Sequence, residues 1–76
     1  MKLSARNVLR GTIRKIEIGA VNAQVTLAIA PDVEVVSIIT ADSVVRLDLF
    51  EGKTAYAVIK ASSVMVAVDL LIVVRS

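Results

Sequence analysis

Residues 57–66 have the sequence Ala57-Val58-Ile59-Lys60-Ala61-Ser62-Ser63-Val64-Met65-Val66. Two apolar runs flank a lysine and two small hydroxyl residues, a pattern that predicts two β-strands joined at a polar turn. Burying an unpaired ammonium is costly, and the nearest acidic residues in the sequence are Glu51 and Asp69. We therefore expect the partner of Lys60 to come from elsewhere in the fold, from another chain or from a bound anion. The hydroxyls of Ser62 and Ser63 are suitable donors to a small, oxygen-rich anion.

The rest of the chain has the pattern of short strands separated by turns. Strands are expected over residues 6–18, 21–29, 33–40, 54–60 and 64–68, and residues 69–76 would extend the fifth strand or form a sixth. In the first strand the apolar side chains change face, which a bend at Gly11 would explain. Gly19 is expected to supply a positive φ to a turn, and one or two helical turns are expected over about Ser43–Leu47. The predicted fold class is all-β, a five- to six-stranded OB-like Greek-key barrel with one short helical turn.

Composition predicts that the chain assembles with copies of itself. The 76 residues include no cysteine and no histidine, 57% are hydrophobic, and the mean hydropathy is +0.81. A domain this small needs disulfides, a metal or association to be stable, and the first two are excluded or disfavoured by the missing residue types. The apolar content also exceeds what one small core can hold. We therefore expect an obligate homo-oligomer, with no free metal cation bound.

The remaining composition narrows the class of function. No apolar segment reaches the roughly 18 residues of a membrane span, and none resembles a signal peptide, so we expect a cytoplasmic protein without membrane contact. An enzyme is disfavoured, because no base accompanies Ser62 or Ser63 and the carboxylates are scattered. A nucleic-acid-binding OB module is the main rival, weakly supported by Arg10, Arg14 and Lys15. The chain has only one Phe and one Tyr for base stacking and a net charge of +2. A purely structural assembly domain is a third possibility.

Several blocks of the sequence together resemble the molbindin or Mop (molybdenum-pterin-binding) domain family, which is related to TOBE domains. The blocks are Ser4-Ala5-Arg6-Asn7, then Leu9 and Gly11, Gly19-Ala20-Val21-Asn22-Ala23, Ile38-Ile39-Thr40, Glu51-Gly52-Lys53 and Ile59-Lys60-Ala61-Ser62-Ser63-Val64-Met65. The resemblance places the domain at residues 1–69, with residues 70–76 as a C-terminal extension. It implies a cytoplasmic hexamer, a trimer of dimers, that stores molybdate or tungstate at subunit interfaces without an organic cofactor and without nucleic acid.

The resemblance also implies two classes of oxyanion site. The first class would combine Ser4, Ala5 and Arg6 of one chain with Thr40, Lys60, Ala61 and Ser62 of another. The second class, near the symmetry axes, would use the turn Gly19, Ala20, Val21 and Asn22. Structural roles compete with these assignments, because Thr40 also suits the cap of the short helix and Gly19 and Asn22 also suit a plain turn.

Overall fold

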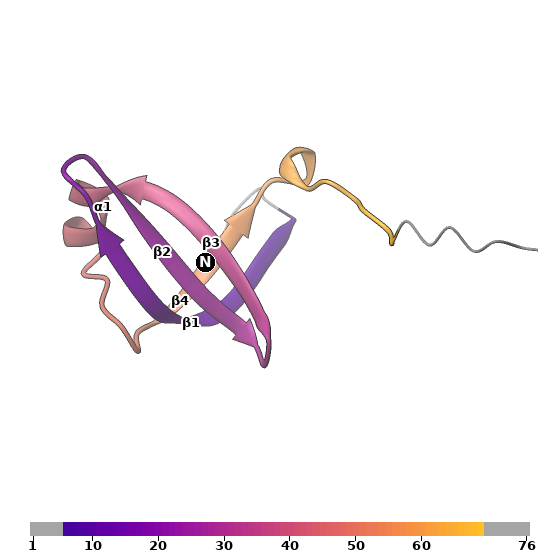
Figure 1. Cartoon of the computed structure of the whole chain (residues 1–76), viewed down its shortest axis with the longest axis horizontal. Coiled ribbons are helices and arrows are strands. Elements are labelled where there is room, and N and C mark those ends of the chain that lie inside the picture. Colours follow the sequence, from indigo (N-terminus) through magenta and orange to yellow (C-terminus); the bar gives the residue numbers. More distant parts are fainter. Residues whose placement is uncertain (1–5, 70–76) are drawn as a thin grey trace, which may run out of the picture.

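The protein folds as one curled antiparallel β-sheet with a short helix at one end (Figure 1). The structure is a computed structural model and describes residues 6–69. Its elements are β1 (Asn7–Ile18), β2 (Asn22–Ala30), β3 (Val33–Thr40), α1 (Ala41–Arg46), β4 (Thr54–Ile59) and the 3-10 turn η1 (Ala61–Ser63). The strand order is β3-β2-β1-β4, so β4 returns after the helix to lie beside β1 in a Greek-key arrangement. The predictions of an all-β fold and of these four strands are confirmed.

The hydrophobic core follows from the alternation in β2. Successive side chains of a strand point to opposite faces, and Ala23, Val25 and Leu27 share the inner face at 2–5% exposure. The complete core cluster consists of Ile13, Ala23, Val25, Leu27, Val44 and Ala57. Thr26 on the outer face of β2 is also buried, because its neighbours on both sides are paired strands. The core therefore lies between the inner face of β1 and β2, the helix α1 and β4.

The irregularity in β1 lies at Arg14 and not at Gly11, where the sequence suggested it. Ile13 pairs with Leu27 and Lys15 pairs with Thr26, so Arg14 is one extra residue in β1. Such a β-bulge moves the following side chains to the other face, which is the change predicted from the sequence. Gly11 has a separate reason to be glycine. A Cβ at this position would lie 2.7 Å from the Ala28 carbonyl oxygen of β2.

The turn between β1 and β2 forms as predicted, but for a different reason. Gly19 does not have a positive φ; among the described glycines only Gly52 does, at 96°. The Gly19 N–H donates to the Asn22 carbonyl oxygen at 2.8 Å, and a Cβ on Gly19 would lie 3.1 Å from that same oxygen. The small residue is thus favoured by the close approach of backbone within the turn.

The helix α1 begins and ends earlier than the predicted range Ser43–Leu47. Thr40 is its N-cap residue, and the Thr40 Oγ1 accepts the Ser43 N–H at 3.0 Å. The Ala41 N–H donates to the Val21 carbonyl oxygen at 2.8 Å, which fixes the start of α1 against the β1–β2 turn. Several residues of this segment are suitable caps, and this contact between distant segments selects Thr40.

The end of α1 is held by a lysine from the following turn. The Lys53 Nζ donates to the carbonyl oxygens of Leu47 and Asp48 at 2.9 and 2.8 Å, and it lies 5.4 Å from the centroid of the Phe50 ring. Cations near the C-terminus of a helix satisfy carbonyl groups that have no partner within the helix. Lys53 therefore connects the end of α1 to the start of β4.

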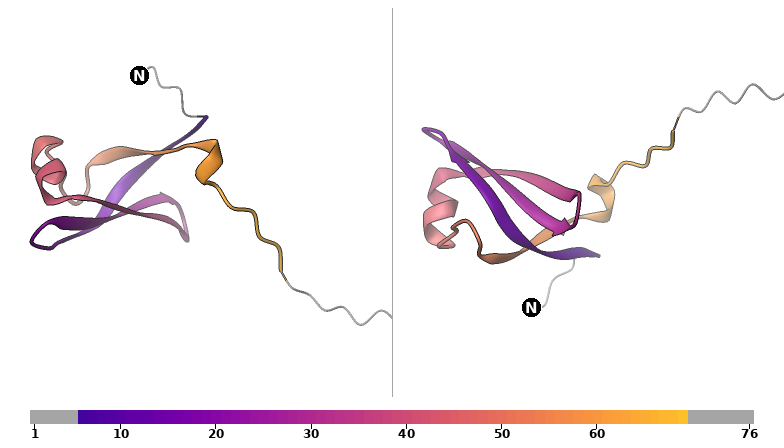
Figure 2. Two further views of the ribbon diagram at one scale, coloured as in Figure 1. Left: turned by 90° about the horizontal axis from the view of Figure 1, so that it is seen from above. Right: turned by 60° about the horizontal axis from the view of Figure 1, so that its bottom comes forward.

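The predicted fifth strand over Val64–Val68 is not formed in this chain. After η1 the segment runs away from the sheet, and Met65, Val66 and Val68 are 94%, 91% and 83% exposed (Figure 2). The edge strands β3 and β4 are not paired with each other, so the described part of the chain forms an open, curled sheet and not a closed barrel. A strand needs a neighbour with free backbone groups, and η1 directs this segment away from both edges. The possible sixth strand over residues 70–76 lies outside the described residues.

Candidate functional site

Several residues of the first predicted class lie together at the η1 end of the sheet. Asn7 of β1 pairs with Ile59 of β4, and the Asn7 Nδ2 donates to the Ile59 carbonyl oxygen at 3.2 Å. Arg6 directly precedes Asn7 and Lys60 directly follows Ile59, so the two cationic residues stand at the same end of paired strands. Ser4 and Ala5, which were predicted to join them, lie outside the described residues.

Lys60 is exposed, and this changes the argument that the sequence suggested for it. It is the N-cap residue of η1 with φ −62° and ψ 141°, and it forms no ion pair within residues 6–69. Its ammonium is therefore solvated in the single chain and needs no buried partner. No partner for Lys60 comes from the described part of its own chain, so the prediction that another chain or a bound anion supplies one stays a prediction, and residues 6–69 leave its positive charge uncompensated beside Arg6.

The η1 turn adds hydrogen-bond donors to this positive charge. The Ser63 N–H donates to the Lys60 carbonyl oxygen at 2.8 Å, and the Val64 N–H lies 3.3 Å from the Ala61 carbonyl oxygen. The N–H groups of Ala61 and Ser62 have no backbone acceptor within the described residues, as is usual for the first residues of a helical turn. Ala61, Ser62 and Ser63 are all exposed. This end of the molecule thus presents N–H, hydroxyl and ammonium donors without a carboxylate partner.

Thr40 lies at the opposite end of the sheet. It pairs with Asn22 at the beginning of β2, next to the turn Gly19–Asn22. The turn of the second predicted class and Thr40 of the first class are therefore neighbours in one chain. Figure 1 shows α1 and the β1–β2 turn together at one end and η1 at the other.

The length of β1 keeps Thr40 and Lys60 apart. β1 has 12 residues, and its Ile18 end adjoins Asn22 and Thr40 while its Asn7 end adjoins Ile59 and Lys60. At about 3.3 Å per residue these ends are separated by about 36 Å along the strand. Hydrogen-bond donors must lie about 3 Å from the oxygen they bind. One small anion therefore cannot contact Thr40 and Lys60 of the same chain.

Two residues that the sequence did not indicate surround Thr40. The Thr40 Oγ1 lies 2.7 Å from the Ser43 Oγ, and the Arg46 Nη2 donates to that Ser43 Oγ at 3.1 Å. The Arg46 Nε also donates to the Asp42 Oδ2 at 3.1 Å. The signal in the sequence is the spacing of three between Thr40, Ser43 and Arg46, which places them in line once Thr40 is known to be the N-cap.

Two of the three basic residues of β1, Arg14 and Lys15, are paired with carboxylates. Arg14 forms an ion pair with Glu34 of β3, and the Lys15 Nζ lies 2.6 Å from the Glu17 Oε1. The hydrogen bond and the charge of Glu17 raise the pKa of Lys15 above its ordinary value, so this lysine stays protonated at neutral pH. Because these two cations are paired with carboxylates, the outer face of the sheet offers little net charge to a phosphate backbone.

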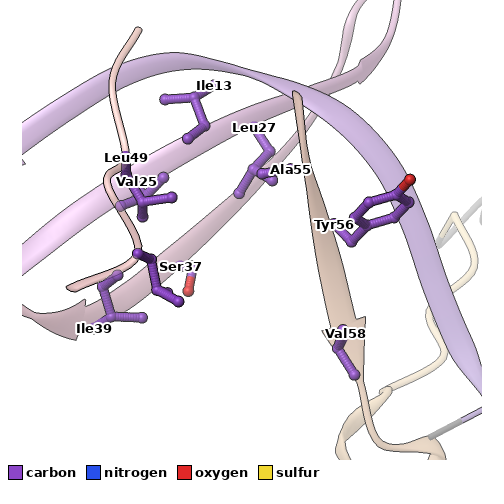
Figure 3. Close-up of a pocket in the computed structure, with 10 residues that line it drawn as sticks. Ile13, Val25, Leu27, Ser37, Ile39, Leu49, Ala55, Tyr56 and Val58 are labelled. Carbon is purple, nitrogen blue, oxygen red and sulfur yellow. The ribbon is translucent and has the colours of Figure 1, made fainter. Parts of the chain in front are cut away.

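One hollow of the described chain is mainly apolar. A cavity of about 340 Å³ opens between the inner face of β2 and β3 and the strand β4 (Figure 3). It is lined by Ile13, Val25, Leu27, Ser37, Ile39, Leu47, Leu49, Ala55, Tyr56 and Val58. Aliphatic walls of this kind do not compensate the lost hydration of an anion. The cavity is a surface for apolar side chains and not an oxyanion site.

Two other classes of site are missing from residues 6–69. These residues contain no group of three or more Asp, Glu, His or Cys side chains that could hold a metal ion. None of the helices described is long and apolar enough to cross a membrane.

Comparison with known proteins shows a consistent set of relatives. A family model of the TOBE domain matches residues 3–66 of the chain. A probable molybdenum-pterin-binding protein of Haemophilus influenzae is 48% identical over 69 residues, covering 91% of this chain and 100% of that protein. The solved structure of a molybdate-binding protein from Sporomusa ovata has a TM-score of 0.82 at 39% identity, covering 88% of this chain and 98% of that one. The cytoplasmic molybdate-binding protein ModG, solved with molybdate bound, has a TM-score of 0.81 at 52% identity, covering 86% of this chain and 46% of that one.

The chain is a TOBE-type domain. This class follows from the curled Greek-key sheet, from the short helix between β3 and β4 and from the family match over residues 3–66. Within that class, the chain belongs to the molybdenum-pterin-binding (Mop, or molbindin) family, as its full-length match to the Haemophilus influenzae relative shows. The resemblance seen in the sequence is thereby confirmed.

Proposed function

We propose that this protein binds molybdate, or the isosteric tungstate, at interfaces between copies of its own chain. A relative named for binding molybdenum-pterin and structural neighbours named for binding molybdate support the ligand. The separation of Thr40 from Lys60 by the whole length of β1 supports the interface, and it is the observation on which the proposal rests. Residues of one predicted site that stand at opposite ends of a chain can meet at one ion only if they come from different chains.

The chemistry of these residues suits a tetrahedral dianion. Such an ion presents only acceptor oxygens, so a site for it needs donors from several directions and no carboxylate. Arg6 and Lys60 would supply positive charge, and Thr40 and Ser62 would supply hydroxyl groups. Ser4 and Ala5 stay in the proposed site, together with the N–H groups of Ala61 and Ser62. Hydrogen bonds to a charged group contribute about 1.5–3 kcal/mol each.

The second proposed class of site uses Gly19, Ala20, Val21 and Asn22. This turn adjoins Thr40, so copies that meet at the α1 end would bring several such turns together. Discrimination against the smaller sulfate would come from the fixed size of either kind of site, because a smaller ion leaves donors unsatisfied.

Self-association is supported by apolar surface that a single chain leaves in water. Val36 and Ile38 on the edge strand β3 are 57% and 62% exposed, in addition to the segment Val64–Val68. A groove lined by Val35, Val36 and Ser37 of β3 and by residues 56–59 of β4 separates the two unpaired edges. The Val64–Val68 segment of a second copy would fit such a groove as an added strand, since edge strands offer free N–H and carbonyl groups.

The biological role that fits this site is storage or homeostasis of molybdenum in the cytoplasm, by a hexamer built as a trimer of dimers. We further propose that residues 1–69 form the domain and that residues 70–76 are an extension. The protein would act without an organic cofactor, without enzymatic activity and without nucleic acid. The paired cations of the outer face argue against the nucleic-acid alternative.

Titration calorimetry of the purified oligomer with molybdate, tungstate and sulfate tests the proposal. We expect saturable binding of molybdate and tungstate and much weaker binding of sulfate. Light scattering in the same buffer should give a single species larger than a monomer. A stable monomer, or heats for molybdate that match those of sulfate, would contradict the proposal.

A further inference from the structure

The side chains of the N-cap residue Thr40, of Ser43 and of Arg46, the last residue of α1, form one continuous series of hydrogen bonds. The Arg46 guanidinium donates to the Ser43 Oγ at 3.1 Å, and the Ser43 Oγ lies 2.7 Å from the Thr40 Oγ1. The Ser43 backbone N–H donates to the same Thr40 Oγ1 at 3.0 Å. The Thr40 hydroxyl is exposed, so it also has a side open to a ligand.

The positions of the donors favour one direction for the hydroxyl protons. A hydroxyl group has one proton and two acceptor lone pairs. Since Arg46 already donates to the Ser43 oxygen, the Ser43 hydroxyl is best oriented away from the guanidinium, where it donates its proton in a hydrogen bond to the Thr40 oxygen. When every hydroxyl in a series of hydrogen bonds accepts from one neighbour and donates to the next, the bonds also polarise one another.

In this arrangement the Thr40 hydroxyl can donate a further hydrogen bond but cannot accept one. Its oxygen accepts from both the Ser43 N–H and the Ser43 hydroxyl, so its two lone pairs are occupied. The Thr40 proton is then free to point away from Ser43, and the positive charge of Arg46 polarises it through Ser43.

We propose that Ser43 and Arg46 are positioning residues that fix the Thr40 hydroxyl as an obligate donor to the oxyanion. The inference rests on the proposed function, because it takes Thr40 to be a ligand of the anion. Its consequence is selectivity by protonation state. A site with an obligate donor accepts molybdate and sulfate, which have no proton, and disfavours hydrogen phosphate, whose proton needs an acceptor.

The test compares Ser43→Ala with the wild-type oligomer, using molybdate by calorimetry and sulfate and hydrogen phosphate as competitors. These two competitors are nearly equal in size and carry the same charge, but only hydrogen phosphate has an O–H group. Ser43→Ala retains the backbone N–H that caps α1, and it frees one lone pair of Thr40. We expect molybdate and sulfate to bind about threefold to tenfold more weakly, while hydrogen phosphate loses less, so that the preference for sulfate over hydrogen phosphate falls.

Three further variants test whether the effect comes from the Ser43 hydroxyl and the Arg46 guanidinium. Ser43→Thr keeps the hydroxyl and should restore both affinity and preference. Val45→Ala, on the exposed face of the same helix, should change neither. Arg46→Met removes the guanidinium that donates to Ser43, and it should also lower the preference for sulfate over hydrogen phosphate. This variant keeps the test valid if Ser43→Ala does not assemble.

The possible results separate this inference from the proposed function. If the wild-type oligomer does not bind molybdate, the proposed function fails. If it binds but Ser43→Ala and Arg46→Met leave the affinities unchanged, or weaken all three anions by the same factor, only the inference is overturned. If Thr40→Ala leaves molybdate affinity unchanged in an assembled protein, Thr40 is not a ligand, and both this inference and the place of Thr40 in the proposed site are overturned.

Discussion

Replacing Lys60 by alanine should weaken molybdate binding without affecting assembly. Lys60 is exposed, has no ion-pair partner within residues 6–69 and stands at the end of β4 beside Arg6. Its removal therefore breaks no contact in the described chain and leaves no unpaired buried group. The expected effect is confined to the anion that the ammonium would face.

The size of the effect follows from the charge and the exposure of Lys60. Two unit charges at about 4 Å attract by about 1 kcal/mol in a water-like dielectric, and a dianion doubles this to about 2 kcal/mol. A hydrogen bond to a charged group has a similar range of about 1.5–3 kcal/mol. Since both estimates describe the same contact, they are not summed. A loss of about 2 kcal/mol corresponds to a dissociation constant about thirtyfold higher.

The assay is titration calorimetry at low and high salt, with light scattering to verify the oligomer. Salt screens exposed charges, so the difference between wild-type protein and Lys60→Ala should shrink at high salt. Lys15→Ala is the matched control, because it removes one positive charge from the outer face, where Lys15 is paired with Glu17. Lys60→Arg should retain most of the affinity. Equal affinities of Lys60→Ala and Lys15→Ala would refute the assignment of Lys60 to the site.

Three other changes test the fold and the assembly. Gly11→Ala should destabilise the protein by about 1–3 kcal/mol in chemical denaturation, because the new methyl group would lie 2.7 Å from the Ala28 carbonyl oxygen; unchanged stability would show that β1 and β2 separate easily there. Lys53→Met should cost about 1 kcal/mol, since the carbonyl oxygens of Leu47 and Asp48 lose their donor; a thermal midpoint equal to that of wild type would exclude this role. Deleting residues 64–76 should abolish the oligomer in light scattering, and an oligomer of the original size would remove this segment from the interface.

The predicted ligands lie at opposite ends of the sheet, which is why the proposed site depends on association between chains. One end presents Lys60 and the η1 donors, and the other presents Thr40 and the turn Gly19–Asn22. Each end alone offers only part of a donor set for a tetrahedral ion. If the proposed function is correct, folding and association together create the site, and a monomer would bind the anion weakly.

Much of the fold could be predicted from the sequence because the signals are local. The strict alternation over Ala23, Val25 and Leu27 identifies β2 and its buried face, and the turn residues limit the strands on either side. The order and spacing of short blocks within the chain were enough to indicate the family, which the comparisons confirm. The η1 end with Lys60 and Ser62 was also indicated, because a lysine and two serines between apolar runs stand out in sequence.

Other features were decided only by the tertiary structure, because they depend on contacts between distant segments. The bulge falls at Arg14 since the pairing of β1 with β2 sets the register, and Thr40 becomes the helix cap since Ala41 bonds to Val21 across the sheet. The direction taken by Val64–Val68 depends on which strand edges are free, and no periodicity in that segment reports this. The sequence by itself determined which residues are apolar, cationic or hydroxylated and in what order. The fold decided that Thr40 and Lys60 lie at opposite ends of β1, because the pairing of β1 with β2 and β4 places the two residues at the two ends of a 12-residue strand.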